Sequence, residues 1–185
     1  MSPSGPADES GAGDGTAGVP TTGIRVGQGF DVHPFLAADE DPGGRVLTLG
    51  GVTFPGEVPL RGHSDADAAA HACADALLGA AGLGDIGQHF PDTDPAWAGA
   101  DSLRLLAEVA GRVRAAGWQP ANVDCTVVAE RPKLVPHRDA MQANLTAAVV
   151  APVSVKATRA EGLGAIGRVE GIACLAVALL VATEP

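Results

Sequence analysis

Aromatic and basic residues are both scarce in this 185-residue chain. It has no tyrosine and only 3% aromatic residues, so a core must be built mainly from aliphatic side chains. Its 12 lysines and arginines are outnumbered by 22 aspartates and glutamates, which gives a formal net charge of −10. Such a surface repels a nucleic-acid backbone, so we expect no nucleic-acid partner.

Cysteines and long hydrophobic runs are also few. Cys73, Cys125 and Cys174 are odd in number and widely spaced, which argues against a disulfide framework and favours the cytoplasm. The longest apolar run, residues 172–182, is too short to span a bilayer and is typical of a buried strand. We therefore expect no membrane association.

The chain divides into a tail and one domain. Residues 1–23 are almost entirely Gly, Ala, Ser, Thr, Pro, Asp and Glu, which bury too little surface to offset the entropy of ordering. We predict that this segment is disordered, and it lacks the pattern of a signal peptide. Residues 24–185 contain enough apolar material for a single core.

Hydrophobic periodicity predicts an α+β fold for residues 24–185, with a mixed β-sheet and helices packed on one face. The predicted strands are residues 24–32, 46–49, 52–54, 123–129, 153–157 and 172–182. The predicted helices are residues 65–83, 101–117 and 136–150.

Two potential metal ligands lie two residues apart in the first predicted strand. Asp31 and His33 would leave the same face of that strand. Carboxylate oxygen and imidazole nitrogen are ordinary zinc ligands, and three protein ligands with an open fourth position are typical of a catalytic site. The alternative is a buried, hydrogen-bonded Asp-His pair without a metal.

His71 is the candidate for the third ligand. Ser64 would cap the helix that carries it, with Asp67 completing a capping box. Asp67, His71 and Asp75 follow a four-residue spacing, so a carboxylate one turn away would orient the imidazole ring. The alternative is a histidine on a polar helix face with no role as a ligand.

Five segments give the chain a specific resemblance. They are Gly-Phe-Asp-Val-His at 29–33, Gly-His-Ser-Asp-Ala-Asp at 62–67, Asp-Ala-Leu-Leu-Gly-Ala at 75–80, Leu-Gly-Asp-Ile-Gly-Gln-His-Phe-Pro-Asp-Thr-Asp-Pro at 83–95, and Gly-Arg-Val-Glu-Gly-Ile-Ala-Cys at 167–174. In this order and spacing, the chain resembles the 2-C-methyl-D-erythritol 2,4-cyclodiphosphate synthase family of the non-mevalonate isoprenoid pathway. The resemblance implies a homotrimer with three shared active sites.

The same resemblance implies a metal-dependent cyclisation. The substrate, 4-diphosphocytidyl-2-C-methyl-D-erythritol 2-phosphate, would yield 2-C-methyl-D-erythritol 2,4-cyclodiphosphate and CMP. Zn²⁺ or another divalent cation would bind Asp31, His33 and His71, and Mg²⁺ or Mn²⁺ would bind Glu161 and the substrate diphosphate. A polyanionic substrate on an acidic chain requires such cations.

The resemblance also assigns contacts with the substrate. Catalytic contacts are expected from His63 and Arg159, although His63 could instead be an exposed residue at the helix entry. Substrate-binding positions are expected at Asp31, His33, His63, Ser64, Asp85, Ile86, Gly87, Phe90, Asp92, Asp94, Ala129, Pro132, Lys133, Val135, Thr158, Arg159, Glu161, Ala165 and Arg168.

Three positions depart from the family pattern. Arg159 stands where a threonine is usual, and its guanidinium would either make a charge-assisted phosphate contact or point into solvent. Ala66 replaces a usual glycine, which we expect to suit a helix start. Ala165 replaces a bulky apolar residue.

Other interpretations remain open. Lys133 could be a solvated surface residue, and Arg168 could pair with Glu170 instead of contacting phosphate or a neighbouring subunit. For the whole protein, one alternative is an inactive or weakly active, metal-stabilised trimer that binds nucleotides. The other is a metal-dependent phosphohydrolase, which would release linear products.

Overall fold

A four-stranded mixed sheet organises the structure, which is a computed structural model that describes residues 23–183. The predicted tail, residues 1–23, lies outside the described residues except for Gly23. The strands follow the order β1 (Ile24–Pro34), β6 (Gly171–Ala182), β4 (Trp118–Val128) and β5 (Val153–Thr158). Only β4 and β5 are parallel, so the predicted mixed sheet is confirmed.

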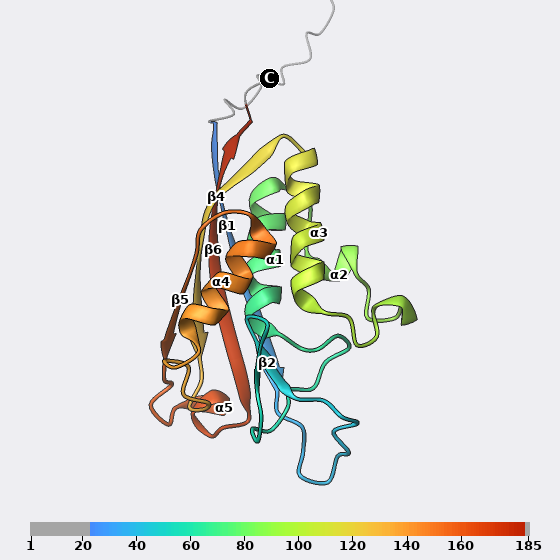
Figure 1. Cartoon of the computed structure of the whole chain (residues 1–185), viewed down its shortest axis with the longest axis vertical. Helices are drawn as coiled ribbons and strands as arrows, with labels where there is room; N and C mark the ends of the chain where they lie inside the picture. The colour runs from blue at the N-terminus through green and yellow to red at the C-terminus, as the bar shows by residue number, and fades with distance from the viewer. Residues whose placement is uncertain (1–22, 184–185) are drawn as a thin grey trace, which may run out of the picture.

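Three longer helices cover one side of this sheet (Figure 1). They are α1 (Ala68–Ala81), α3 (Ser102–Ala115) and α4 (Arg138–Val149). Helix α1 lies against β1 and β6, and α3 packs on its other side, so 11 of its 14 residues are buried. A helix that is apolar nearly all round belongs in a core.

Smaller elements complete the fold. The hairpin of β2 (Leu47–Leu49) and β3 (Val52–Phe54) turns through Gly50 and Gly51, as predicted. The short elements α2 (Ile86–His89), η1 (Pro95–Trp97) and α5 (Gly164–Gly167) were not predicted, since three or four residues carry no periodic signal.

Glycines allow α1 to lie directly on β1. A Cβ atom at Gly29 would stand 2.0 Å from the carbonyl oxygen of Ala72, and one at Gly27 would stand 2.2 Å from that of Ala76. Both contacts are with backbone of α1, which cannot give way locally. This close approach brings the end of β1 next to the helix that carries His71.

The opposite side of the sheet is open and partly apolar. Ile24, Val26, Phe30 and Val32 alternate along β1 on this side and are 49–66% exposed, with Val177 of β6 beside them. A group of exposed apolar side chains of this size is typical of an interaction surface.

Two predictions about the start of α1 are wrong. The helix begins at Ala68 instead of residue 65, and its cap is Asp67, whose carboxylate accepts hydrogen bonds from the backbone of Ala69 and Ala70. Ala66 has φ of 59°, so it occupies the left-handed region, where a glycine would be unstrained. It therefore precedes the helix and does not belong to its first turn.

Strand β4 is longer than predicted, since it begins at Trp118 and passes a register shift between Pro120 and Asn122. Proline cannot donate to the ladder, so its presence in the strand was not expected from the sequence. None of the helices in the described part of the chain is long and apolar enough to cross a membrane.

Candidate metal centre and substrate cavity

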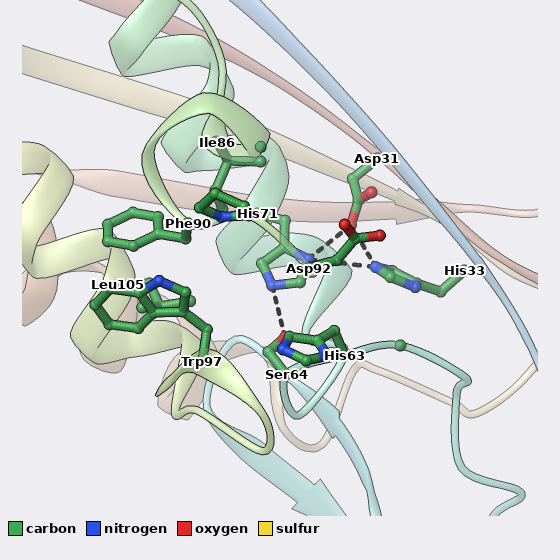
Figure 2. Close-up of a pocket in the computed structure, with 13 residues that line it drawn as sticks. Asp31, His33, His63, Ser64, His71, Ile86, Phe90, Asp92, Trp97 and Leu105 are labelled. Carbon is green, nitrogen blue, oxygen red and sulfur yellow. Dashed lines mark hydrogen bonds and ion pairs between the residues drawn. The ribbon is translucent and has the colours of Figure 1, made fainter. Parts of the chain in front are cut away.

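Asp31, His33 and His71 meet at the junction of β1 and α1. Asp31 Oδ2 lies 3.0 Å from His33 Nε2 and 3.0 Å from His71 Nδ1, and the two nitrogens are 3.3 Å apart. Figure 2 shows the three side chains pointing toward one another. The predicted same-face arrangement of Asp31 and His33 is confirmed.

This triangle has the size of one face of a metal coordination shell. Three ligands of a tetrahedral ion, each about 2.0–2.1 Å from it, are about 3.3–3.4 Å apart. The observed distances are only slightly shorter, and among the described residues this is the single cluster of three potential ligands. The three residues can therefore hold a divalent metal ion.

The charge balance of the triangle favours an ionised carboxylate. Burial opposes the charge on Asp31, but hydrogen bonds from His33 and His71 outweigh it and lower its pKa well below the ordinary value. Burial also opposes protonation of His33, but the Asp31 carboxylate outweighs it and raises the pKa of that ring. A bound cation would take the place of these protons.

Backbone and side-chain contacts hold both rings. His33 Nδ1 lies 2.7 Å from the carbonyl oxygen of Arg61, to which it donates, leaving Nε2 to face the other ligands. His71 Nε2 lies 2.9 Å from Ser102 Oγ and 3.1 Å from Ser64 Oγ. Such outer contacts fix which ring nitrogen is free for a metal.

The predicted carboxylate partner of His71 is wrong. Asp67 accepts from the backbone of Gly50 and Gly51 as well as capping α1, and Asp75 accepts from the backbone nitrogen of Ile86 at 2.8 Å. The four-residue spacing places these carboxylates on the side of the helix that carries His71. Both carboxylates nevertheless accept hydrogen bonds from nearby backbone N–H groups and not from the imidazole. Serine hydroxyls orient the ring in their place.

Ser64 differs from its prediction in the same way. It does not cap α1, although its Oγ accepts from the backbone nitrogen of Ala66. Its other contacts are with His71 and, at 3.3 Å, with Ser102. Ser64 therefore belongs to the surroundings of the metal centre.

A cavity of about 480 Å³ opens over the metal centre. Phe90 and Trp97 form its apolar side, with their ring centroids 4.9 Å apart in an edge-to-face arrangement. The cavity brings together eight of the predicted substrate-binding residues: Asp31, His33, His63, Ser64, Ile86, Gly87, Phe90 and Asp92.

Two further predicted residues border this region in structural roles. Asp85 caps α2 by accepting from the backbone of Gln88, and Asp94 caps η1 by accepting from Ala96. His63 Nε2 lies 3.1 Å from the carbonyl oxygen of Asp94, so one nitrogen of its ring is engaged. The remaining ring nitrogen of His63 has no hydrogen-bond partner among residues 23–183 and can contact a ligand in the cavity.

A second cavity, of about 310 Å³, lies where β4 and β5 end. It contains five other predicted residues: Ala129, Pro132, Lys133, Thr158 and Arg159. The predicted set is therefore divided between two cavities of one chain.

The remaining predicted residues are outside both cavities. Glu161, with φ of 52°, lines a neighbouring cavity of about 490 Å³ together with Arg159. Val135 is 81% exposed and Ala165 lies on α5. Arg168 Nε donates to Glu170 Oε1 at 2.6 Å. Within one chain, Arg168 therefore forms the ion pair that was the alternative to a phosphate contact.

Two residues of the site, Ser102 and Glu130, carry no local sequence pattern that marks them as functional. Ser102 lies in the first turn of a predicted helix, yet it is 1% exposed and contacts both His71 and the Asp65 carboxylate. Glu130 lies between the predicted substrate-binding positions Ala129 and Pro132, but its ion pair with Arg159 joins residues 29 positions apart. Only the packing of distant segments could reveal either contact.

Comparison with known proteins gives a consistent result. The model of the YgbB family matches residues 24–181. A 2-C-methyl-D-erythritol 2,4-cyclodiphosphate synthase of Bordetella petrii is 58% identical over 160 residues, which cover 85% of this chain and 95% of that protein. The synthase of Chromobacterium violaceum is 57% identical over 160 residues, with coverages of 85% and 98%.

A solved structure has the same fold. The complex of IspF from Plasmodium falciparum with CDP superimposes with a TM-score of 0.73 at 34% sequence identity, covering 88% of this chain and 98% of that one. The fold and the sequence thus lead to the same group of proteins.

Proposed function

The chain belongs to the YgbB family, and we propose that it catalyses the reaction after which its curated relatives are named, the synthesis of 2-C-methyl-D-erythritol 2,4-cyclodiphosphate. The substrate is 4-diphosphocytidyl-2-C-methyl-D-erythritol 2-phosphate. An oxygen of its 2-phosphate forms a bond with the β-phosphorus, and the bond from that phosphorus to the bridging oxygen breaks. CMP leaves with the bonding electrons, so no water is consumed.

One observation carries this proposal: the triangle of Asp31, His33 and His71 lies at the floor of the cavity that brings together eight predicted substrate-binding residues. A divalent ion bound there, which we propose to be zinc, supplies a positive charge for a phosphate oxygen. The three side chains would hold that ion from one side and leave the side toward the cavity open.

The residues around this centre would position the substrate. The reaction needs no side-chain nucleophile, so catalysis depends on alignment and on neutralising charge. Ser64 and the protonated ring of His63 would donate to phosphate, and the Phe90 side of the cavity would exclude water. Backbone groups at Ile86 and Gly87, with Asp92, would contact the methylerythritol part.

The cavity at the ends of β4 and β5 would bind the nucleotide. Ala129 and Pro132 would present backbone groups to the cytosine, while Lys133 and Arg159 would contact phosphate oxygens. The positive charges of Lys133 and Arg159 would favour binding of a diphosphate in this cavity. Their proximity is notable because the chain has only 12 basic residues. Thr158 would add a hydroxyl at the same edge.

Glu161 would hold a second cation, Mg²⁺ or Mn²⁺. It has no cluster of protein ligands around it among the described residues, but Mg²⁺ is often bound by one carboxylate with substrate phosphates and water. Its position beside Arg159 would place the ion close to the diphosphate.

We propose that the active protein is a homotrimer. The metal centre lies on β1 and the nucleotide cavity at β5, and these are opposite edges of the sheet, about 14 Å apart at about 4.8 Å per strand. Packing the β1 edge of one subunit next to the β5 edge of another would join the two halves. The apolar open face supports such contacts, and Asp85, Asp94, Val135, Ala165 and Arg168 would contact substrate or a neighbouring subunit.

We also propose a cytoplasmic location, because the three cysteines are free and buried, as in proteins of reducing compartments.

The reaction can be tested by incubating the protein with the cytidine diphosphate substrate and Mn²⁺ or Mg²⁺, with and without a chelator. Phosphorus NMR should show a cyclic diphosphate and CMP, and chelation should abolish both. Linear phosphates would indicate the phosphohydrolase instead. Substrate binding without turnover would indicate the non-catalytic nucleotide-binding trimer.

A further inference from the structure

An ion pair at the nucleotide cavity links two loops that follow parallel strands. Glu130 comes two residues after β4 and Arg159 directly after β5, and the register pairs Val128 with Thr158 at the strand ends. Arg159 Nε donates to Glu130 Oε2 at 2.8 Å. The backbone nitrogen of Gly162 donates to the other carboxylate oxygen at 3.3 Å.

The two partners differ in exposure. The side chain of Glu130 is 9% exposed and is held by donors on both oxygens, whereas that of Arg159 is 66% exposed. The hydrogen bond from Arg159 lowers the pKa of Glu130, so the carboxylate is ionised at neutral pH. Glu130 is thus a fixed, charged anchor for a long and otherwise mobile side chain.

Only one nitrogen of the Arg159 guanidinium is used by this anchor. Nε is bound to Glu130, and no hydrogen bond joins either terminal nitrogen to another described residue. A guanidinium held by Nε presents its two terminal amino groups as a planar fork, which matches two oxygens of a phosphate. Arg159 lines both the cavity that contains Lys133 and the cavity that contains Glu161.

We infer that Glu130 is a positioning residue that holds Arg159 ready to bind the diphosphate of the nucleotide. This inference rests on the proposed function, since it concerns the same nucleotide cavity. Immobilising a free arginine on binding loses rotamer entropy, and the anchor removes much of that loss beforehand. Glu130 therefore favours phosphate binding although it carries a negative charge itself.

A double-mutant cycle tests this inference with CDP and cytidine as probes, using full-length protein and titration by calorimetry or NMR. Arg159→Thr should weaken CDP binding roughly tenfold and leave cytidine binding unchanged. Glu130→Ala should weaken CDP binding several-fold in the native background but not in the Arg159→Thr background. Glu130→Gln, which keeps an acceptor for Nε, should retain most of the affinity.

The controls separate the inference from the proposed function. Arg138→Thr removes an arginine that is 53% exposed and pairs with Asp139 at the start of α4, away from the nucleotide cavity, and should leave CDP affinity unchanged. Unchanged cytidine binding in each variant shows that the cavity is folded.

Two results would overturn the inference alone: unchanged CDP affinity in Arg159→Thr, or an equal loss from Glu130→Ala in both backgrounds. Failure of the native protein to bind CDP would overturn the nucleotide site and the inference together.

Discussion

The Oγ atom of Ser102 lies 2.9 Å from Nε2 of His71, on the side of the ring opposite the metal centre. Ser102 also donates a short hydrogen bond to the Asp65 carboxylate, so its oxygen is left to accept from the imidazole N–H. When a cation replaces the proton that Nδ1 shares with Asp31, this order of donors keeps the proton on Nε2 and leaves the lone pair of Nδ1 for the ion. Ser102 thereby selects the form of His71 that can bind a metal.

Ser102→Ala should weaken zinc binding. Loss of the acceptor removes the preference for the Nε2-protonated ring, and changes to such outer contacts typically reduce metal affinity about 10–100-fold. Calorimetric titration of the metal-free protein with zinc measures the effect. The matched control is Thr48→Ala, which removes an exposed hydroxyl that donates to the backbone oxygen of Val46. Equal losses of zinc affinity in the two variants would contradict the role of Ser102.

Zinc should stabilise the folded protein. The three ligand atoms converge only when β1 packs on α1, so the ion binds the native state and not the unfolded chain. At a zinc concentration 100 times the dissociation constant, the free energy of unfolding should rise by about 2.7 kcal/mol.

Thermal or urea unfolding with and without zinc measures this stabilisation. His71→Asn should abolish the zinc-dependent change, and His137→Asn, at the start of α4, should retain it. A zinc response that survives in His71→Asn would show that the ion binds elsewhere.

Zinc affinity should fall as the pH is lowered, because protons compete for the same ring nitrogens. Burial opposes protonation of His33, but the Asp31 carboxylate raises its pKa above the ordinary value of 6.5. The loss of affinity should therefore begin at a higher pH than for an ordinary histidine. Titrations at pH 8, 7 and 6 measure it, and an affinity that is constant down to pH 6 would contradict the coupling between Asp31 and His33.

The sequence was sufficient for the elements that carry long periodic patterns. The alternation along β1 correctly placed Asp31 and His33 on one face, and the apolar residues of α1 correctly indicated a helix that carries His71. These features depend on local geometry, which a sequence pattern reports directly.

Side-chain hydrogen bonds for which several polar partners compete could not be predicted from local sequence patterns. Asp67 and Asp75 have the right spacing to contact His71. Backbone N–H groups that are shielded from water need hydrogen-bond acceptors, however, and they donate to both carboxylates. Ser102 reaches His71 across 31 residues, and no local pattern encodes that contact. The sequence therefore predicted the three residues that meet in a cluster able to hold a metal ion, and it missed the residues that orient them.

Val150→Gly should stabilise the protein. Val150 ends α4 with φ of 59°, where a β-branched side chain is strained and glycine is the usual residue. Its side chain is 65% exposed, so little packing is lost on removal. We expect a gain of about 1 kcal/mol, equivalent to about 2–4 °C in the midpoint of thermal unfolding.

The control for this prediction is Val46→Gly. Val46 is also exposed but does not have a positive φ, so glycine there should lower the midpoint by increasing the entropy of the unfolded chain. A lower midpoint in both variants would show that the backbone at Val150 is not strained.

Gly29→Ala should disrupt the metal centre by separating the two elements that form it. The new Cβ would lie 2.0 Å from the carbonyl oxygen of Ala72, so α1 must move away from β1. We expect a loss of roughly 3 kcal/mol in the free energy of unfolding by urea, together with weaker zinc binding because His71 moves with α1. Gly111→Ala is the matched control, since nothing lies within 4 Å of a Cβ at that position of α3, and it should stabilise the protein by about 1 kcal/mol. If Gly29→Ala kept native stability and zinc affinity, close contact between β1 and α1 would not be what brings Asp31, His33 and His71 together.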